Sequence, residues 1–144
     1  MKAPFDIAAD LDTPVSAYIK LKRFRPCFLL ESVEGGERLA RYSFIGLGAR
    51  LTLELFPDAL RINSEKHPRP VDGSAWLKIL RESLAASPTL TPAVAGIPFS
   101  GGLVGTTGYD VVRFFERIPA NQSELAGLPE AAYVAPESLL IFDH

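Results

Sequence analysis

Residues 49–56, with the sequence ARLTLELF, alternate between apolar and polar side chains. Leucine occupies positions 51, 53 and 55, whereas Thr52 and Glu54 lie between them. A period of two is typical of a β-strand with one buried face and one wetted face. The alternation therefore predicts a sheet that packs against a core on one side and meets water on the other.

Further strand-like runs lie close to this one in the sequence. Residues 27–33 (CFLLESV) and 41–47 (RYSFIGL) are joined by EGGERLA, whose paired glycines permit the positive φ angles of a turn. These two runs predict a hairpin or a pair of linked strands. Residues 59–63 (ALRIN) are expected to pair back onto residues 49–56, and residues 138–143 (SLLIFD) to form the last strand.

Two segments have helical character. The sequence Asp12-Thr13-Pro14 places a capping side chain and a first-turn proline before VSAYIKLKRF, which predicts a short helix. Asp72 or Ser74 is expected to cap a second helix over residues 75–87. Strands and helices occur in groups without βαβ alternation, so the fold class is predicted to be α+β rather than a doubly wound parallel sheet.

The connecting segments are rich in proline, glycine and polar residues. Residues 62–74 (INSEKHPRPVDGS) are predicted to be a loop, and residues 87–98 (SPTLTPAVAGIP) a mobile connector broken by three prolines. Residues 99–119 begin glycine-rich and strand-like, and a short helical piece is expected from Tyr109 and Asp110 onward. The glycine series at 100–108 (SGGLVGTTG) lacks the Lys-Ser/Thr ending of a phosphate loop, so a strand against which another backbone packs closely is favoured.

Length and charge exclude several functions. The 144 residues fit one average domain, and a net charge of −2 with 22% charged residues gives no basic field for nucleic acid or an anionic membrane. No apolar run approaches the roughly 20 residues that span a bilayer, and the first residues carry acids where a signal peptide would be apolar. We therefore predict a cytoplasmic protein without nucleic-acid or membrane partners.

The residues that could carry chemistry are few. The two histidines, His67 and His144, have no ligand partners at metal-site spacing, so no metal site and no catalytic residue is predicted in this chain. The single cysteine, Cys27, lies in an apolar run and is expected to pack as a small hydrophobic residue.

The polar end of the first hairpin strand raises a separate question. A glutamate that ends a buried strand, as Glu31 does, needs water, a cation or a bound ammonium group. One interpretation pairs Glu31 with Arg41 or Arg38 across the hairpin. The other makes Glu31, Ser32 and Arg41 the rim of a pocket for an amino acid, whose ammonium suits a carboxylate and whose carboxylate suits a guanidinium or hydroxyl.

Four ordered segments resemble a known family. They are DTPVSAYIKL, FLLESVEGGERLARYSFIG, PFSGGLVGTTGYDVVRFFERIP and ESLLIFDH, and together they resemble the N-terminal region of anthranilate synthase component I. The resemblance covers residues 12–144, and the segment between Pro57 and Pro98 contributes little to it. Thr106 and Thr107 are smaller and more polar than the aromatic or aliphatic residue that the family pattern would place beside the glycine. This departure concerns the local packing and does not change the resemblance to the family.

The resemblance implies a function for a longer protein. Full-length members convert chorismate and glutamine-derived ammonia to anthranilate and pyruvate, with Mg²⁺ and a partner glutamine amidotransferase subunit (component II), in tryptophan biosynthesis. Their catalytic and Mg²⁺ residues lie in a C-terminal chorismate-binding part, so this chain alone is expected to be inactive and to hold no cofactor. The abrupt end after the apolar run LLIF also favours a piece of a longer protein, cut either by design or by proteolysis.

The resemblance also implies a regulatory site and a fold. Residues 1–144 would be a regulatory domain that senses L-tryptophan as a feedback inhibitor, with the site on Leu30, Glu31, Ser32 and Arg41. Tyr42 and Ser43 adjoin this cation and are weaker candidates. The implied fold has antiparallel sheets packed face to face with flanking helices, and an unpaired last strand could give a homodimer.

Two alternatives stay open at this point. The chain could be the similar N-terminal part of aminodeoxychorismate synthase component I, in which a tryptophan site need not regulate. It could instead be a docking module for the amidotransferase subunit with no ligand site.

Overall fold

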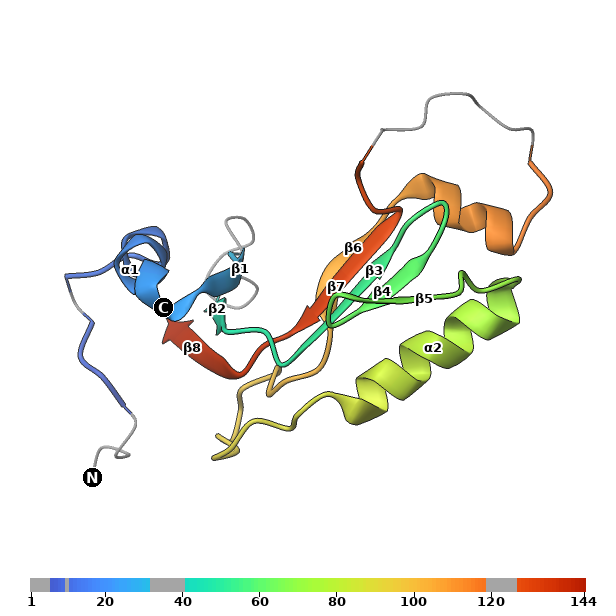
Figure 1. The fold of residues 1–144 in the computed structure, drawn as a ribbon. Helices are drawn as coiled ribbons and strands as arrows, with labels where there is room; N and C mark the ends of the chain where they lie inside the picture. The colour runs from blue at the N-terminus through green and yellow to red at the C-terminus, as the bar shows by residue number, and fades with distance from the viewer. Residues whose placement is uncertain (1–5, 10, 32–40, 119–126) are drawn as a thin grey trace. The chain divides into compact units, whose positions relative to one another are not determined.

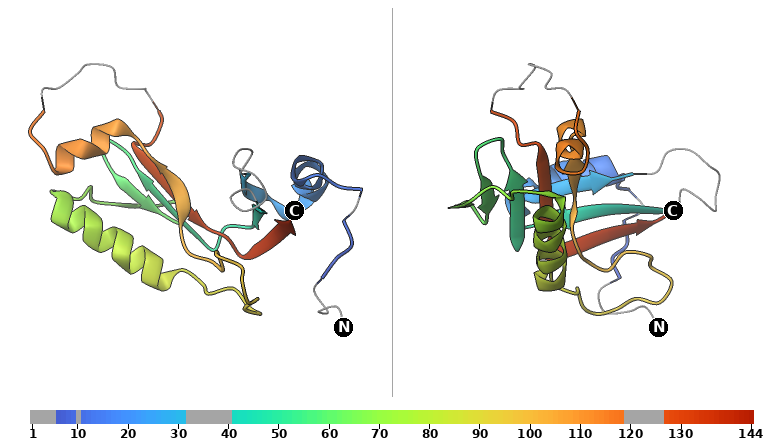
Figure 2. Two further views of the ribbon diagram at one scale, coloured as in Figure 1. Left: turned by 180° about the vertical axis from the view of Figure 1, so that it is seen from behind. Right: turned by 90° about the vertical axis from the view of Figure 1, so that its right-hand side faces the viewer.

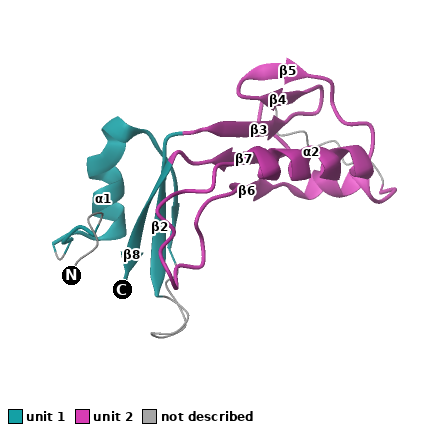
Figure 3. Cartoon of the chain, turned by 90° about the horizontal axis from the view of Figure 1, so that it is seen from below, with its two compact units in different colours: residues 1–48, 138–144 teal, residues 49–137 magenta. Residues whose placement is uncertain are grey.

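The computed structural model describes residues 6–9, 11–31, 41–118 and 127–144 (Figure 1). The chain divides into two compact units, which are described separately below (Figure 3). Unit 1 comprises residues 1–48 and 138–144, and unit 2 comprises residues 49–137. Both units contain helices and antiparallel sheets, so the predicted α+β class is confirmed.

Unit 1 is a three-stranded antiparallel sheet with a short helix. The strand order is β1-β2-β8, and the helix α1 contacts β1 and β2. The elements are α1 (Pro14–Lys20), the 3-10 helix η1 (Leu21–Phe24), β1 (Pro26–Leu30), β2 (Tyr42–Leu47) and β8 (Ser138–Asp143). The predicted hairpin strands, the first helix and the last strand are all present.

The start of α1 follows from its sequence. Thr13 accepts a hydrogen bond from the Ser16 amide at 3.1 Å, and the Thr13 amide donates to Ser16 Oγ at 2.9 Å. This reciprocal capping box satisfies two backbone donors that the first helical turn would otherwise leave open, and Pro14 at the helix start has no donor to satisfy.

Unit 2 is built on a five-stranded antiparallel sheet with the order β5-β4-β3-β7-β6. Figure 2 shows α2 running alongside these strands. The elements are β3 (Leu51–Leu55), β4 (Leu60–Ile62), β5 (Glu65–His67), α2 (Gly73–Ala86), β6 (Val104–Thr107), the 3-10 helix η2 (Tyr109–Phe114) and β7 (Ala131–Ala135).

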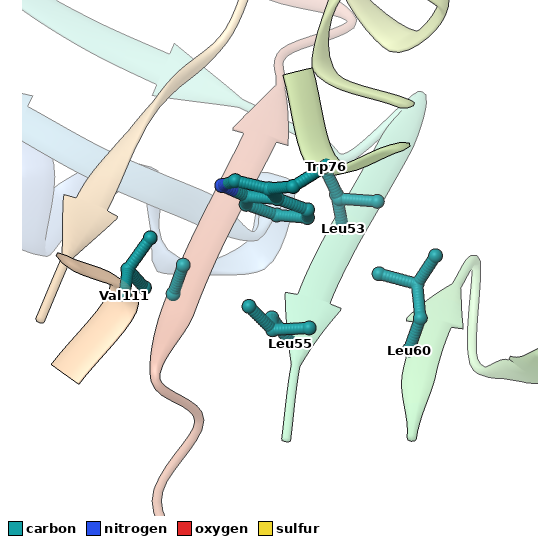
Figure 4. Packing of buried hydrophobic residues seen from close by; sticks show 6 residues of the cluster. Leu53, Leu55, Leu60, Trp76 and Val111 are labelled. Carbon is teal, nitrogen blue, oxygen red and sulfur yellow. The ribbon is translucent and has the colours of Figure 1, made fainter. Parts of the chain in front are cut away.

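The core of unit 2 forms around the single tryptophan (Figure 4). Trp76 of α2 is 1% exposed and stacks on Phe114 of η2, with ring centroids 6.3 Å apart. Leu53 and Leu55 of β3 are fully buried in the same cluster, which confirms the alternating face read from the sequence. Asp72 caps α2 by accepting from the Ala75 amide at 2.8 Å, so of the two expected caps Asp72 is the one used.

Two elements of unit 2 differ from the prediction. The stretch predicted as a loop over residues 62–74 contains β5, which pairs with β4 through a turn whose residues Asn63 and Ser64 have φ angles of 50° and 70°. The strand β7 was not predicted at all, although it lies between β3 and β6. The expected connector at residues 87–98 contains no helix or strand, and only Thr89 forms an isolated bridge, to Gly101.

The glycine-rich segment behaves as the closely packed strand that the sequence favoured. A Cβ atom at Gly105 of β6 would lie 2.0 Å from the Ala132 carbonyl oxygen and 2.7 Å from Tyr133 Cα, both on β7. The backbone of β7 therefore occupies the space that a side chain at position 105 would need.

Candidate functional site

The hairpin of unit 1 brings the predicted site residues to one end of its sheet. Leu30 is the last residue of β1 and pairs with Phe44 of β2. Glu31 therefore follows β1 at the end where Arg41 precedes Tyr42, the first residue of β2. The local sequence produces this arrangement because the two strands are antiparallel and close together in the chain. Ser32 lies outside the described residues.

On β1 and β2, one face of the sheet at this end carries apolar and aromatic side chains. Leu30 and Phe44 are cross-strand partners, and Tyr42 lies two residues before Phe44, so the three side chains share a face. The rings of Tyr42 and Phe44 are 6.1 Å apart and tilted by 43°. Leu30 is 43% exposed, so the apolar surface remains accessible at its edge.

The cation Arg41 is held by an acid from the far end of the sequence. Its Nε donates to Asp143 Oδ1 at 2.6 Å and its Nη2 donates to Asp143 Oδ2 at 2.8 Å, and its guanidinium carbon lies 5.0 Å from the Tyr42 ring centroid. The hydrogen bonds with Asp143 raise the pKa of Arg41, and the same bonds lower the pKa of Asp143. Both groups therefore remain charged at neutral pH.

This ion pair corrects one interpretation of the hairpin. Among the residues that the structure describes, the acid that pairs with Arg41 is Asp143, and the suggested bridge from Glu31 to Arg41 is not formed. Arg38, the other suggested partner of Glu31, lies outside the described residues. Glu31 is exposed, so water can solvate its carboxylate.

The neighbouring residue His144 fixes the same stretch of β2. The His144 amide donates to the Arg41 carbonyl oxygen at 2.8 Å, and Ser43 Oγ lies 2.8 Å from His144 Nε2. Ser43 is 1% exposed, so this hydrogen bond satisfies a buried hydroxyl. The His144 ring also stacks on Phe142, with centroids 6.4 Å apart.

Asp143 and His144 were not predicted to belong to the site. Both are in ESLLIFDH, and the last strand was predicted, but nothing in the sequence indicated which strand it would join. The pairing of Tyr42 with Asp143 in the β2–β8 ladder is what places these residues beside Arg41.

Other predicted chemistry has these outcomes. The described residues contain no group of three or more His, Cys, Asp or Glu side chains that could hold a metal ion. Cys27 is half-buried in β1, and burial raises the pKa of its thiol, in agreement with the expected packing role. Among the described helices, none is long and apolar enough to cross a membrane.

The fold and the site together define an α+β chain. In this chain, β1, β2 and the end of β8 place the charged residues Glu31, Arg41 and Asp143 beside apolar side chains of the sheet. Known proteins with a similar sequence are components of anthranilate synthase. The chain is 42% identical to anthranilate synthase component 1 of Thermus thermophilus over 137 residues, which are 94% of this chain and 28% of that protein. It is 37% identical over 144 residues to the protein of the same name from Pseudomonas aeruginosa, covering 97% of this chain and 29% of that protein.

A solved structure of a protein with the same name also matches this chain. The crystal structure of anthranilate synthase component I from Streptococcus pneumoniae matches all of this chain and 30% of its own, with a TM-score of 0.57 and 26% identity. No family model matches the chain. The predicted resemblance is confirmed: this chain is a relative of part of anthranilate synthase component I, and it spans about 28% of the length of the curated relatives it matches.

Proposed function

We propose that the chain is the N-terminal, tryptophan-sensing part of an anthranilate synthase component I that acts in the cytoplasm. The whole protein would convert chorismate and glutamine-derived ammonia to anthranilate and pyruvate. The observation that supports the sensing role is the sheet end of unit 1, where Glu31 directly follows β1 and Arg41 directly precedes β2, beside the apolar residues Leu30 and Tyr42.

The chemistry of tryptophan suits this sheet end. Its ammonium group matches the carboxylate of Glu31, and its carboxylate matches the guanidinium of Arg41. Its indole matches the apolar face that Leu30 and Tyr42 share. Ser32 would add a hydroxyl to the carboxylate, a role that rests on the sequence resemblance alone.

The described part of the chain supplies one side of such a pocket. We propose that a C-terminal catalytic domain supplies the other side and also carries the chorismate and Mg²⁺ sites, and that a glutamine amidotransferase subunit delivers ammonia. Tryptophan would then inhibit by binding better to a low-activity arrangement of the two parts. Such coupling between sites is typically about 1–3 kcal/mol.

Calorimetry on the full-length protein tests the proposed site. Arg41→Ala removes hydrogen bonds to a charged ligand group, each typically about 1.5–3 kcal/mol, so tryptophan should bind at least about tenfold more weakly. Ser32→Ala should also weaken binding. The matched control is Arg61→Ala: Arg61 is an exposed arginine on β4 that lies over the Phe56 ring at 4.4 Å, and its removal should leave the affinity unchanged.

Three results would contradict the proposal. Unchanged tryptophan affinity in both Arg41→Ala and Ser32→Ala would exclude the assigned site. Formation of aminodeoxychorismate in place of anthranilate by the full-length protein would exclude the assigned reaction. A complex with the amidotransferase subunit but no tryptophan binding by the wild-type protein would leave only a docking function.

A further inference from the structure

We propose that Asp143 is a positioning residue for the ligand-binding cation Arg41, so that the end of β8 is a third segment of the tryptophan site. This inference rests on the proposed function and extends it to a residue that comes from the opposite end of the chain. The observation that carries it is the two-point ion pair between Arg41 and Asp143.

The geometry of the pair leaves one edge of the guanidinium for a ligand. Arginine has five N–H donors, and Asp143 accepts from Nε and from one N–H of Nη2. The edge formed by Nη1 and the second N–H of Nη2 is the one that Asp143 does not use. A ligand carboxylate can accept two parallel hydrogen bonds from that edge, while Asp143 holds the adjacent edge formed by Nε and Nη2.

The backbone around the pair is fixed on both strands. Tyr42 and Asp143 are partners in the β2–β8 ladder, and the His144 amide continues the ladder to the Arg41 carbonyl. Ser43, next along β2, is buried and bonded to the His144 ring. Asp143 therefore projects from a position that cannot shift along β2 without breaking these bonds.

Asp143 has two opposing effects on ligand binding. It partly neutralises Arg41, which weakens the attraction of a carboxylate, but both side chains are about half exposed, at 54% and 50%, so water and salt screen this effect. It also orders a long side chain before the ligand arrives, and ordering such a side chain on binding is a recognised cost. We take the second effect to be the larger one.

The test compares two ligands on the full-length protein by calorimetry. L-Tryptophan carries the carboxylate that Arg41 would bind, whereas L-tryptophanamide lacks it. Asp143→Ala should weaken the binding of L-tryptophan about three- to tenfold and change the binding of L-tryptophanamide by less than about twofold. A purely structural loss would weaken both ligands to the same extent.

Two further variants make the result interpretable. Asp143→Asn keeps an acceptor and the shape of the side chain, so it should fold even if Asp143→Ala does not, and it should give a smaller loss in the same direction. Asp58→Ala removes another exposed ion pair, Lys66–Asp58 at 2.9 Å in unit 2, and should leave both affinities unchanged.

The outcomes separate the two proposals. If wild-type protein binds tryptophan and both Asp143 variants bind it as tightly, or lose both ligands equally, the positioning role is wrong and the proposed function stands. If wild-type protein does not bind tryptophan, the proposed function is wrong and this inference fails with it.

Discussion

Replacing Gly105 with alanine should destabilise unit 2 strongly. The added Cβ atom would lie 2.0 Å from the Ala132 carbonyl oxygen, whereas real Cβ atoms essentially never approach closer than 3.0 Å. The obstacle is backbone and cannot rotate away, so β6 and β7 must separate by about 1 Å. Hydrogen bonds in proteins normally span about 2.7–3.2 Å, so such a shift breaks those near position 105.

The expected magnitude follows from the ladder that is disturbed. β6 and β7 pair over Val104–Thr107 and Ala131–Val134, with Gly105 opposite Tyr133 inside the ladder. Loss of two to four hydrogen bonds, each with a net value of about 1 kcal/mol, gives a destabilisation of about 2–4 kcal/mol. This range agrees with the usual cost of overpacking a close contact, about 1–3 kcal/mol and occasionally more.

The assay is a urea titration of the 144-residue chain in which tryptophan fluorescence is the recorded signal. Trp76 is the single tryptophan, is 1% exposed, and its ring centroid lies 6.4 Å from that of Tyr133 on β7, so its emission reports the unfolding of unit 2. The matched control is Thr106→Ala on the same strand, an exposed position where alanine should cost less than about 1 kcal/mol. If Gly105→Ala loses no more stability than Thr106→Ala, the close approach of β7 is not the reason for glycine at this position.

Two further outcomes are expected. Asp72→Ala removes the cap of α2 and should lower the free energy of unfolding by about 1 kcal/mol in the same urea titration. The control Ser74→Ala should change the free energy of unfolding by less than about 0.5 kcal/mol. A larger loss in Ser74→Ala than in Asp72→Ala would mean that Ser74 is the cap. Burial raises the pKa of Cys27, and the thiolate is the reactive form, so alkylation should need a higher pH in the folded chain than in urea. Equal pH profiles in both states would contradict that shift.

Local sequence patterns were sufficient to predict many of the helices and strands. The alternation around Leu53 predicted β3, and the capping sequence before Pro14 predicted α1, because both signals depend on neighbouring residues. The hairpin of β1 and β2 was predictable for the same reason. It accounts for the placement of Leu30, Glu31, Arg41 and Tyr42 at one sheet end.

The missed strands show where local signals fail. β5 has the sequence Glu-Lys-His between polar and proline residues, which looks like a loop, but it is an edge strand, where charged side chains are common. β7 is rich in alanine, which has a low strand preference. Its small residues Ala131 and Ala135 are buried at 1% and 0% exposure, and this packing cannot be read from the strand alone.

The pairing of Arg41 with Asp143 could not be predicted from the sequence for a related reason. Arg41 and Asp143 are 102 residues apart, and their contact depends on the register of the β2–β8 ladder. The sequence indicates both strands and both charged residues. It does not indicate that β2 pairs with β8, because this pairing depends on how the intervening chain folds.

That intervening chain explains how β8 reaches β2. In unit 2, Leu51 at the start of β3 pairs with Ala135 at the end of β7, and only a few residues separate these from the end of β2 and the start of β8. Closing a loop as long as residues 51–135 costs on the order of 4 kcal/mol in chain entropy. The β3–β7 pairing already closes that loop in the native structure, so β8 can join β2 without a second large entropy cost. The β3–β7 pairing therefore favours the ladder that holds Asp143 beside Arg41, and a change that destabilises this pairing, such as Gly105→Ala, should also make the β2–β8 ladder less stable.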